Sequence, residues 1–237
     1  MNSNLNSSSS NAFSSDDLSI VIRVKNESEF IGSAIQSCLD FIEFPQIIVV
    51  DNNSTDESVL VARLFAQDSK IPVATERFTD VQIVSISDYS PGKSLNLGIQ
   101  KANRKYIMIL SSHCNITAFD FDSLTSKLEQ YSAVFGKQIP YYRGKRIKPN
   151  YLWSHFVNVP VENMYSSLED RYFFHNAFSF STRKFLIDHP FDEELVSKED
   201  RYWVNDLISR GSSFYYDPKH VSSHHYTPNG NTWKGIG

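Results

Sequence analysis

Carboxylate side chains stand at two positions where a ligand could meet them, and the first is Asp51. Four β-branched residues at 47–50 predict a strand buried on both faces of a parallel sheet, and Asp51 follows directly. Because ligands bind outside the carboxyl ends of strands in open α/β sheets, Asp51 could read a base or a sugar hydroxyl. It could equally cap the helix expected from residue 57. The spacing leaves both interpretations open.

The second position is the adjacent pair Glu199 and Asp200, which precedes apolar residues at helical spacing. Acidic residues at the start of a helix are usually capping residues. Three histidines, His220, His224 and His225, follow further along the chain. A carboxylate held near histidines is also a group that can act as a general base. Adjacent histidines can in turn bind a metal ion.

A phosphate-binding loop is suggested by Gly92-Lys93-Ser94, but the surrounding residues argue against it. The P-loop requires a glycine five residues before Gly92, where this chain has Ser87. The strand expected at residues 106–110 also ends without the aspartate that such ATPases use for magnesium. Lys93 at a helix start therefore remains either a contact to a diphosphate or an exposed lysine.

Two further polar segments have simpler alternatives. Asp120 and Asp122 form an Asp-x-Asp triplet, but they lie past the end of a strand and open a helix, so capping explains them better. The aromatic and basic run at 141–148 could meet an anionic acceptor or a membrane surface. It could also be an exposed, solvated loop.

Composition narrows the class of protein. A chain of 237 residues with 41% hydrophobic residues suits one α/β domain, and a net charge of −4 gives no electrostatic reason to expect nucleic acid. Cys38 and Cys114 show neither disulfide nor zinc spacing, which fits a reducing cytoplasm. No apolar run approaches the ~20 residues that span a bilayer. Residues 1–16, rich in Ser and Asn, predict a disordered lead-in rather than a signal peptide.

Strands and helices alternate through the first half of the chain. Strands are expected at residues 18–24, 46–50, 81–86 and 106–110, and helices at 28–41, 57–67 and 93–102. This alternation predicts an α/β fold with a doubly wound, mostly parallel sheet. After residue 138 the pattern changes: an irregular strand pair is expected at 172–182, a helix from about 199 and an aromatic strand from 214.

Six segments, taken in order, resemble the family 2 glycosyltransferases, which are inverting enzymes with the GT-A fold. They are residues 20–27, 49–56, 90–96, 109–113, 135–138 and 199–200. The resemblance covers about residues 18–226. It implies one GT-A domain, residues 17–237, in which residues 17–138 bind a nucleotide-sugar and residues 139–237 form a C-terminal half that binds the acceptor.

The resemblance also implies roles on the donor side. Asp51 matches the family's carboxylate that reads the nucleotide base. The remaining donor-binding residues would be Arg23, Lys25, Lys93, Ser111 and His113.

On the acceptor side, the resemblance implies that Asp200 is the general base that removes a proton from an acceptor hydroxyl. Glu199 would support it. Asn176 and Trp203 would contact the acceptor, and His224 would lie near the diphosphate or its metal.

One departure from the family's pattern concerns the metal site. Where the family usually has Asp-x-Asp, this chain has Ser111-Ser112-His113, and a serine hydroxyl is a poor ligand for Mg²⁺ or Mn²⁺. Either His113 and His224 form a depleted site that binds Mg²⁺ or Mn²⁺ weakly, or cationic and histidine side chains meet the leaving-group charge without metal. We predict weak or no metal dependence.

These expectations together describe an enzyme that moves a sugar from a nucleotide-sugar donor to a glycan or lipid-linked acceptor. The pathway would be surface polysaccharide biosynthesis, such as capsule or lipopolysaccharide, in the cytoplasm or at the inner face of the membrane. The alternative is a non-catalytic module, derived from such an enzyme, that binds a nucleotide-sugar or a glycan. The missing Asp-x-Asp motivates this alternative, and the retained Glu199-Asp200 argues against it.

Overall fold

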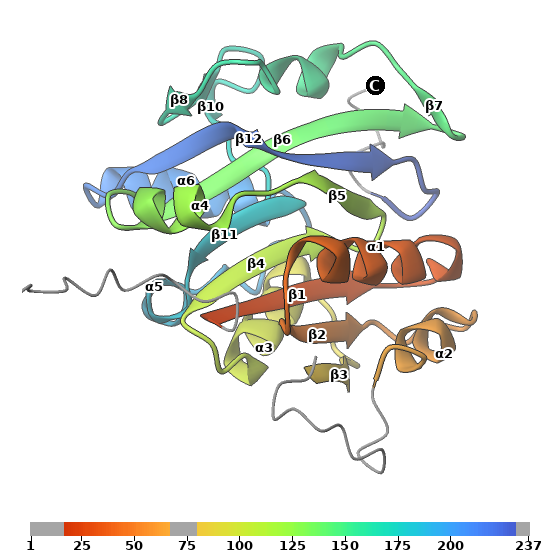
Figure 1. The fold of residues 1–237 in the computed structure, drawn as a ribbon. Coiled ribbons are helices and arrows are strands. Elements are labelled where there is room, and N and C mark those ends of the chain that lie inside the picture. The colour runs from red at the N-terminus through yellow and green to blue at the C-terminus, as the bar shows by residue number, and fades with distance from the viewer. Residues whose placement is uncertain (1–16, 67–79, 231–237) are drawn as a thin grey trace, which may run out of the picture.

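The chain folds around one large mixed sheet, which positions every candidate site residue. The structure is a computed structural model that describes residues 17–66 and 80–230. In this part of the chain the strand order is β3-β2-β1-β4-β11-β6-β12-β5 (Figure 1). The strands are β1 (Leu18–Val24), β2 (Gln46–Asp51), β3 (Asp80–Ser85), β4 (Tyr106–Ser111), β5 (Cys114–Ala118), β6 (Ala133–Tyr142), β11 (Phe178–Thr182) and β12 (Phe214–His225).

Four short strands and seven helical segments complete the described elements. Two of the short strands, β7 (Lys145–Arg146) and β8 (Val161–Glu162), pair with β6 and β12, and β9 (Tyr165–Ser166) pairs with β10 (Arg171–Tyr172). The helices are α1 (Ser28–Phe41), α2 (Ser58–Arg63), α3 (Pro91–Lys101), α4 (Phe121–Leu128), the 3-10 helix η2 (Tyr151–His155), α5 (Arg183–Asp188) and α6 (Glu199–Ser209).

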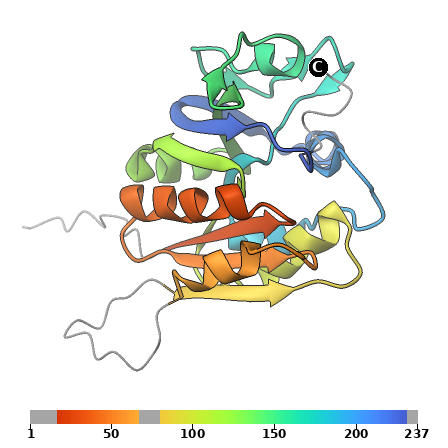
Figure 2. The same ribbon diagram turned by 90° about the vertical axis from the view of Figure 1, so that its right-hand side faces the viewer.

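Helices cover both faces of the sheet, as Figures 1 and 2 show. Side chains alternate between the faces of a strand, so Ile20 and Ile22 of β1 join one apolar cluster and Val21 joins the other. The first cluster includes buried residues of α1 and α4, and the second includes buried residues of α3, α5 and α6. The predicted doubly wound, mostly parallel α/β fold is therefore confirmed.

The direction of the strands brings several chain segments to one edge of the sheet. β4 runs parallel to β1, and β11 runs antiparallel to both β4 and β6. β6 therefore runs in the same direction as β1, and β12 is parallel to β6. The carboxyl ends of β1, β2, β4, β6 and β12 consequently lie along the same edge.

Local sequence signals located most elements closely. The predicted bounds of β1 and α1 are exact, and β2 extends one residue further to include Asp51. The helix expected from residue 93 begins at Pro91, because the Ser90 hydroxyl accepts a hydrogen bond from Lys93 N and proline suits the first helical position. Asp120 caps α4 by accepting from Ser123 N, as predicted.

Two predictions about elements need correction. The helix expected at residues 57–67 ends at Arg63 among the described residues. The strand pair expected at 172–182 does not form, because β10 pairs with β9 while β11 inserts between β4 and β6. The antiparallel insertion of β11 is a long-range pairing for which the local pattern carries no signal.

The two cysteines are free and buried, and burial raises the pKa of both thiols. Across the described residues, none of the helices has both the length and the apolar character needed to cross a bilayer. The lead-in predicted at residues 1–16 lies outside the described residues.

Candidate active site

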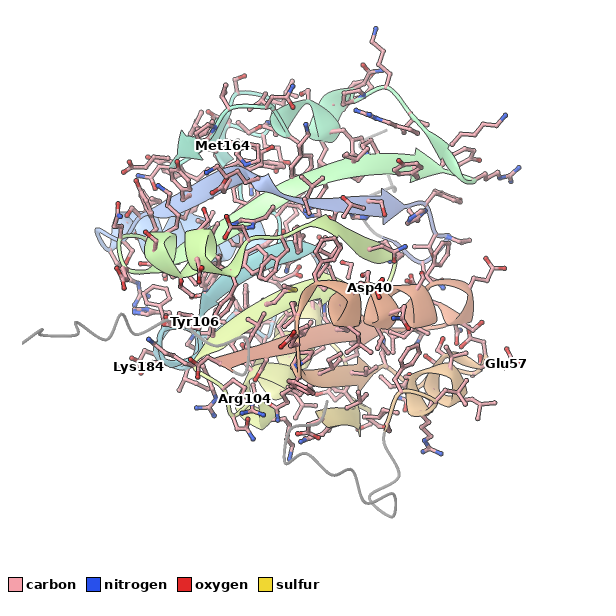
Figure 3. The ribbon with its side chains drawn as sticks, viewed as in Figure 1. Asp40, Glu57, Arg104, Tyr106, Met164 and Lys184 are labelled. Carbon is pink, nitrogen blue, oxygen red and sulfur yellow. The ribbon has the colours of Figure 1, made fainter. Side chains whose placement is uncertain are left out.

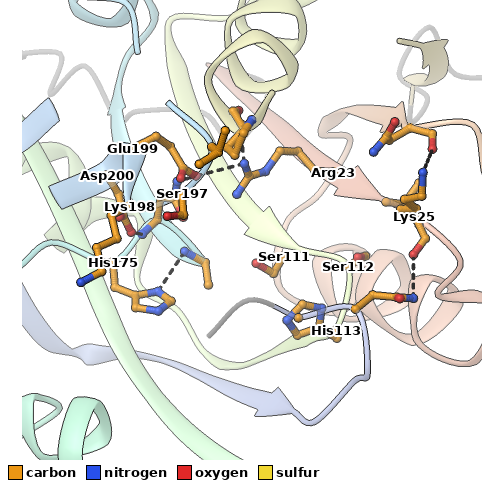
Figure 4. A pocket seen from close by; sticks show the side chains of 18 of the residues that line it. Arg23, Lys25, Ser111, Ser112, His113, His175, Ser197, Lys198, Glu199 and Asp200 are labelled. Atoms are coloured by element: carbon orange, nitrogen blue, oxygen red, sulfur yellow. Dashed lines mark hydrogen bonds and ion pairs between the residues drawn. The ribbon is translucent and has the colours of Figure 1, made fainter. Parts of the chain in front are cut away.

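A cavity of about 440 Å³ opens at the sheet edge where the strand ends meet. Its walls come from the ends of β1 and β4, the segment before β11, and the start of α6 (Figure 4). Seven of the residues predicted from the sequence line it: Arg23, Lys25, Ser111, His113, Asn176, Glu199 and Asp200. Segments from both halves of the chain thus contribute to a single pocket.

The acidic wall of this pocket consists of Glu199 and Asp200 with the groups that hold them. Glu199 Oε1 accepts hydrogen bonds from Arg23 Nη1 at 3.0 Å and from Asn176 Nδ2 at 2.9 Å. The backbone N–H of Asn176 donates to Asp200 Oδ2 at 3.1 Å. Asn176 therefore bridges the two carboxylates and fixes their separation, although it was predicted as an acceptor contact.

The two carboxylates differ in their proton affinity. Burial alone would raise the pKa of Glu199, but the charge of Arg23 and the Asn176 hydrogen bond outweigh it and lower that pKa. For Asp200, burial and the adjacent Glu199 charge outweigh the opposing effect of Arg201, so its pKa is raised. Paired acids whose pKa values move apart are typical of acid–base sites. Asp200 is the better proton acceptor of the two.

Arg201 anchors Asp200 and was not singled out from the sequence. Its Nη1 donates to Asp200 Oδ2 and to the carbonyl of Phe174, both at 2.7 Å, and its backbone N–H donates to Asp200 Oδ1 at 2.8 Å. The guanidinium lies 4.2 Å from the centroid of the Phe173 ring. The carboxylate of Asp200 is thus held in one orientation by a buried arginine.

A second group, here called the histidine wall, is a chain of hydrogen bonds through Glu27, His113, His224, Gln138 and His175. Of these residues, Glu27, His113 and His175 line the pocket, and His224 and Gln138 lie behind them. Glu27 Oε2 lies 2.7 Å from Nδ1 of His113, and the Nε2 atoms of His113 and His224 are 3.1 Å apart. His224 Nδ1 lies 2.7 Å from Gln138 Oε1, and Gln138 Nε2 lies 3.1 Å from His175 Nδ1. All five side chains are buried.

The donors and acceptors along the histidine wall can be assigned from one backbone group. The N–H of Ala177 donates to His175 Nδ1 at 3.3 Å, so this nitrogen is an acceptor. The amide nitrogen of Gln138 then faces His175, and its oxygen accepts from His224 Nδ1. Burial, with the neighbouring histidines, holds the pKa of His224 well below its usual value. His224 Nε2 is therefore unprotonated and accepts from His113.

This assignment determines whether a proton lies between Glu27 and His113, at the end of the histidine wall. Because His113 donates through Nε2, its Nδ1 and Glu27 Oε2 must share a proton, since two acceptors would repel at 2.7 Å. The hydroxyl of Ser112 also donates to Glu27 Oε2 at 2.8 Å. Glu27 Oε2 and His113 Nδ1 thus share one proton, in addition to the proton on His113 Nε2, and the pair has no net charge.

The predicted metal site at His113 and His224 does not fit this chemistry. The Nε2 atoms of the two rings are hydrogen-bonded to each other. Nδ1 of His113 is hydrogen-bonded to Glu27, and Nδ1 of His224 to Gln138. No group of three or more His, Cys, Asp or Glu side chains in residues 17–66 and 80–230 is placed to hold a metal ion. Mg²⁺ and Mn²⁺ prefer several anionic oxygen ligands, and Glu27, the carboxylate of this wall, is already hydrogen-bonded to Ser112 and His113.

Asp51 lies just behind the pocket. It is buried at the end of β2, and its carboxylate accepts from Ser54 N at 3.2 Å. It does not cap α2, whose N-cap is Glu57, so the helix-cap interpretation is wrong. The next residue, Asn52, lines the pocket. The role of Asp51 in base recognition stays a prediction.

Lys93 and Trp203, like Asp51 and His224, lie outside the pocket lining. Lys93 forms an ion pair with Asp88, whose hydrogen bond raises the lysine pKa. Trp203 was expected to contact the acceptor, but it is 5% exposed, its ring stacks on Phe191, and its Nε1 donates to the carbonyl of His189. The structure thus places Trp203 in the core, where the apolar spacing of α6 directs it.

Comparison with known proteins identifies the family. The model of glycosyl transferase family 2 matches residues 19–196, three quarters of the chain. The chain belongs to glycosyl transferase family 2. No curated protein matches the sequence significantly.

Solved structures with the same fold include two glycosyltransferases with bound nucleotide. The structure of S. aureus TarS 1-349 in complex with UDP-GlcNAc has a TM-score of 0.66 and 15% identity, over 90% of this chain and 60% of that chain. GalNAc-T7 with UDP, GalNAc and Mn²⁺ has a TM-score of 0.66 and 14% identity, over 90% of this chain and 44% of that chain. At these identities the likeness establishes the GT-A fold, and this family 2 chain spans about three fifths of the TarS structure.

Proposed function

We propose that this family 2 chain is an inverting glycosyltransferase that transfers a sugar from a nucleotide-sugar to a hydroxyl of a glycan or lipid-linked acceptor. The observation that carries the proposal is the position of Asp200, a buried carboxylate that lines the pocket and is held in one orientation by Arg201 and Asn176. Its raised pKa, caused mainly by burial, supports this role. The nucleotide-sugar bound in the TarS structure supports a donor of the same class.

The proposed reaction uses Asp200 as the general base. A carboxylate oxygen of Asp200 removes the proton from the acceptor hydroxyl, whose oxygen attacks the anomeric carbon from the side opposite the leaving group. The bond between that carbon and the phosphate oxygen breaks, and the nucleotide leaves with the electron pair. Glu199 remains ionised, because Arg23 and Asn176 stabilise its negative charge.

The donor would lie at the carboxyl ends of β1 and β4. Arg23 and Lys25 line the pocket there, opposite Ser111 and His113. A guanidinium and an ammonium favour a phosphate leaving group. The Ser111 hydroxyl offers a hydrogen bond in place of the carboxylates that the family usually has at this position, whereas both ring nitrogens of His113 are already hydrogen-bonded to Glu27 and His224. Asp51, behind Asn52, is the proposed determinant for the base.

We further propose that the reaction has weak or no dependence on Mg²⁺ or Mn²⁺. The neutral Glu27–His113 pair supports this proposal, because a cation there would have to displace a shared proton. Donor turnover should therefore persist after treatment with EDTA. Turnover that EDTA abolishes and Mn²⁺ restores would contradict it.

A panel of UDP-, GDP-, dTDP- and CMP-linked sugars tests the function and identifies the donor. At about a hundredfold above its Kd, a ligand stabilises the native state by ~2.7 kcal/mol, which raises Tm by about 5–10 °C for a chain of this size. We expect one nucleotide class to give this shift and to be hydrolysed slowly without acceptor. If no donor raises Tm or is turned over, the proposed function is wrong.

The second candidate is the non-catalytic binding module, favoured by the replacement of Asp-x-Asp by Ser111-Ser112-His113. It predicts the same Tm shift with no turnover in EDTA or in Mn²⁺. The proposed acceptor, a cytoplasmic precursor of a surface polysaccharide such as capsule or lipopolysaccharide, would then be bound without reaction.

A further inference from the structure

The chain contains a long segment without negative charge. From residue 130 to residue 161 there is no Asp or Glu, whereas five lysines and arginines occur, in a chain whose net charge is −4. They are Lys137, Arg143, Lys145, Arg146 and Lys148. A charge run of this kind is often a solvated face, so its structural setting decides what it can do.

Four of these cations are concentrated on the β6–β7 hairpin and the residues that follow it, 141–148, here called the cationic hairpin. Arg143 and Gly144 both have positive φ, 49° and 77°, as a tight two-residue hairpin turn requires. Arg143, Lys145, Arg146 and Lys148 are all exposed. No carboxylate of the described residues forms an ion pair with any of the four, and Figure 3 shows long side chains with terminal nitrogens projecting from this hairpin.

Exposed aromatic and apolar side chains lie in the same segment. Tyr142 is 41% exposed and stacks under Arg143, and Tyr151 at the start of η2 is 61% exposed. Val157 and Val159 follow, at 38% and 61%. Tyrosine beside lysine and arginine is the composition of a bilayer interface, where the rings enter the headgroup layer and the cations meet lipid phosphates.

The cationic hairpin lies at the same edge of the sheet as the pocket. It extends from the carboxyl end of β6, which runs in the same direction as β1, and the carboxyl end of β1 contributes Arg23 and Val24 to the pocket. A short connection joins them: Tyr226 N donates to the carbonyl of Tyr141 at 2.8 Å, and Asn229 lines the pocket and donates to the carbonyl of Lys25. A surface that bound the hairpin would also lie near the pocket mouth.

We propose that the cationic hairpin, with the exposed rings of Tyr142 and Tyr151, docks the protein on the surface of a bilayer that contains anionic phospholipid. Charge alone would also suit a soluble polyanion, but the exposed tyrosines favour a surface with an apolar layer beneath its phosphates. The docking itself does not require catalysis. Only its consequence, that a lipid-linked acceptor meets the pocket, rests on the proposed function.

Vesicle co-sedimentation of the full chain tests the proposal. The vesicles are phosphatidylcholine alone, or phosphatidylcholine with phosphatidylglycerol. The test variant combines Arg143→Ser, Lys145→Ser, Arg146→Ser and Lys148→Ser. The control combines Arg63→Ser, Lys101→Ser, Lys184→Ser and Lys219→Ser, which removes the same charge from exposed positions outside the hairpin; Figure 3 shows Lys184 at the opposite end of the sheet. A second variant, Tyr151→Ser, tests the aromatic contribution.

We expect binding to the anionic vesicles only. Since each cation near such a surface contributes about a fivefold gain, the test variant should bind at least ~100-fold more weakly, while the control keeps most of the affinity. Tyr151→Ser should weaken binding by several fold. Equal losses in the test variant and control would overturn the proposal, as would binding to heparin without binding to vesicles. The donor panel is read in the absence of vesicles, so failure of docking and failure of the proposed function are distinguishable.

Discussion

The two walls of the pocket differ in how they stabilise buried ionisable groups. On the acidic wall, Glu199 and Asp200 keep carboxylates beside Arg23 and Arg201. On the histidine wall, Glu27 and the rings behind it share protons until no net charge remains. The acidic wall therefore offers a carboxylate lone pair that can accept a proton. The nitrogen and oxygen atoms of the histidine wall are instead hydrogen-bonded to one another. This contrast places base chemistry on one side only.

Removing charge from the acidic wall should have the larger effect on catalysis. Glu199→Gln leaves Arg23 without its ion pair and removes a charge that raises the pKa of Asp200. We expect turnover to fall by ~10–100-fold. Because the base acts when deprotonated, the acid limb of the kcat/KM profile should move to lower pH. The control is Glu194→Gln, at an exposed position outside the pocket. An acid limb that stayed in place or moved up would contradict the proposed pairing.

Changes on the histidine wall should act mainly on stability. Glu27→Ala leaves Ser112 and His113 without their buried acceptor and should cost about 3 kcal/mol in urea unfolding. Glu27→Gln should cost only about 1 kcal/mol, since an amide nitrogen in place of Oε2 can donate one hydrogen to His113 Nδ1 and the other to the Ser112 hydroxyl oxygen. Glu29→Ala, an exposed residue of the same helix, is the control. Equal losses for Ala and Gln would argue against the shared proton.

The smallest effect concerns the loop behind Glu27. Asp56 accepts from Ser58 and from the N–H of Ser28, and these hydrogen bonds outweigh desolvation and lower its pKa from 3.8 to about 2. Asp56→Asn should cost about 1–2 kcal/mol at neutral pH, allowing for solvent screening. A depressed pKa stabilises the fold above about 3.8, and this contribution is lost as the pH falls through about 2. The difference in unfolding free energy between Asp56→Asn and wild type should therefore shrink as the pH falls toward 2.

The difference between the walls also explains what could be predicted from the sequence. The β1 and α1 bounds, the Asp120 cap and the acidic pair depend on residues within one turn or strand, so local patterns locate them. The histidine wall joins residues 37 to 111 positions apart, which no local pattern encodes. His113 and His224 were singled out from the sequence, but as metal ligands, and Glu27 and Gln138 lay in segments matched to the family without a role.

Trp203 shows the reverse case, in which the local pattern was correct and the assigned role was not. The apolar residues of α6, including Val204 and Leu207, face the core at helical spacing, and Trp203 joins them. The expectation that it contacts an acceptor came from the resemblance alone. Arg201, two residues earlier, is the side chain of α6 that meets the acidic pair.

Donor affinity and turnover of Asp200→Asn, measured together, test the central claim most directly. The substitution keeps the size of the side chain and removes the proton acceptor. We predict that transfer falls by about 10³-fold or more, with the Kd for the donor and the Tm close to wild type. Turnover near the wild-type rate would show that another group is the base. Loss of donor binding in parallel with turnover would show that Asp200 holds the donor.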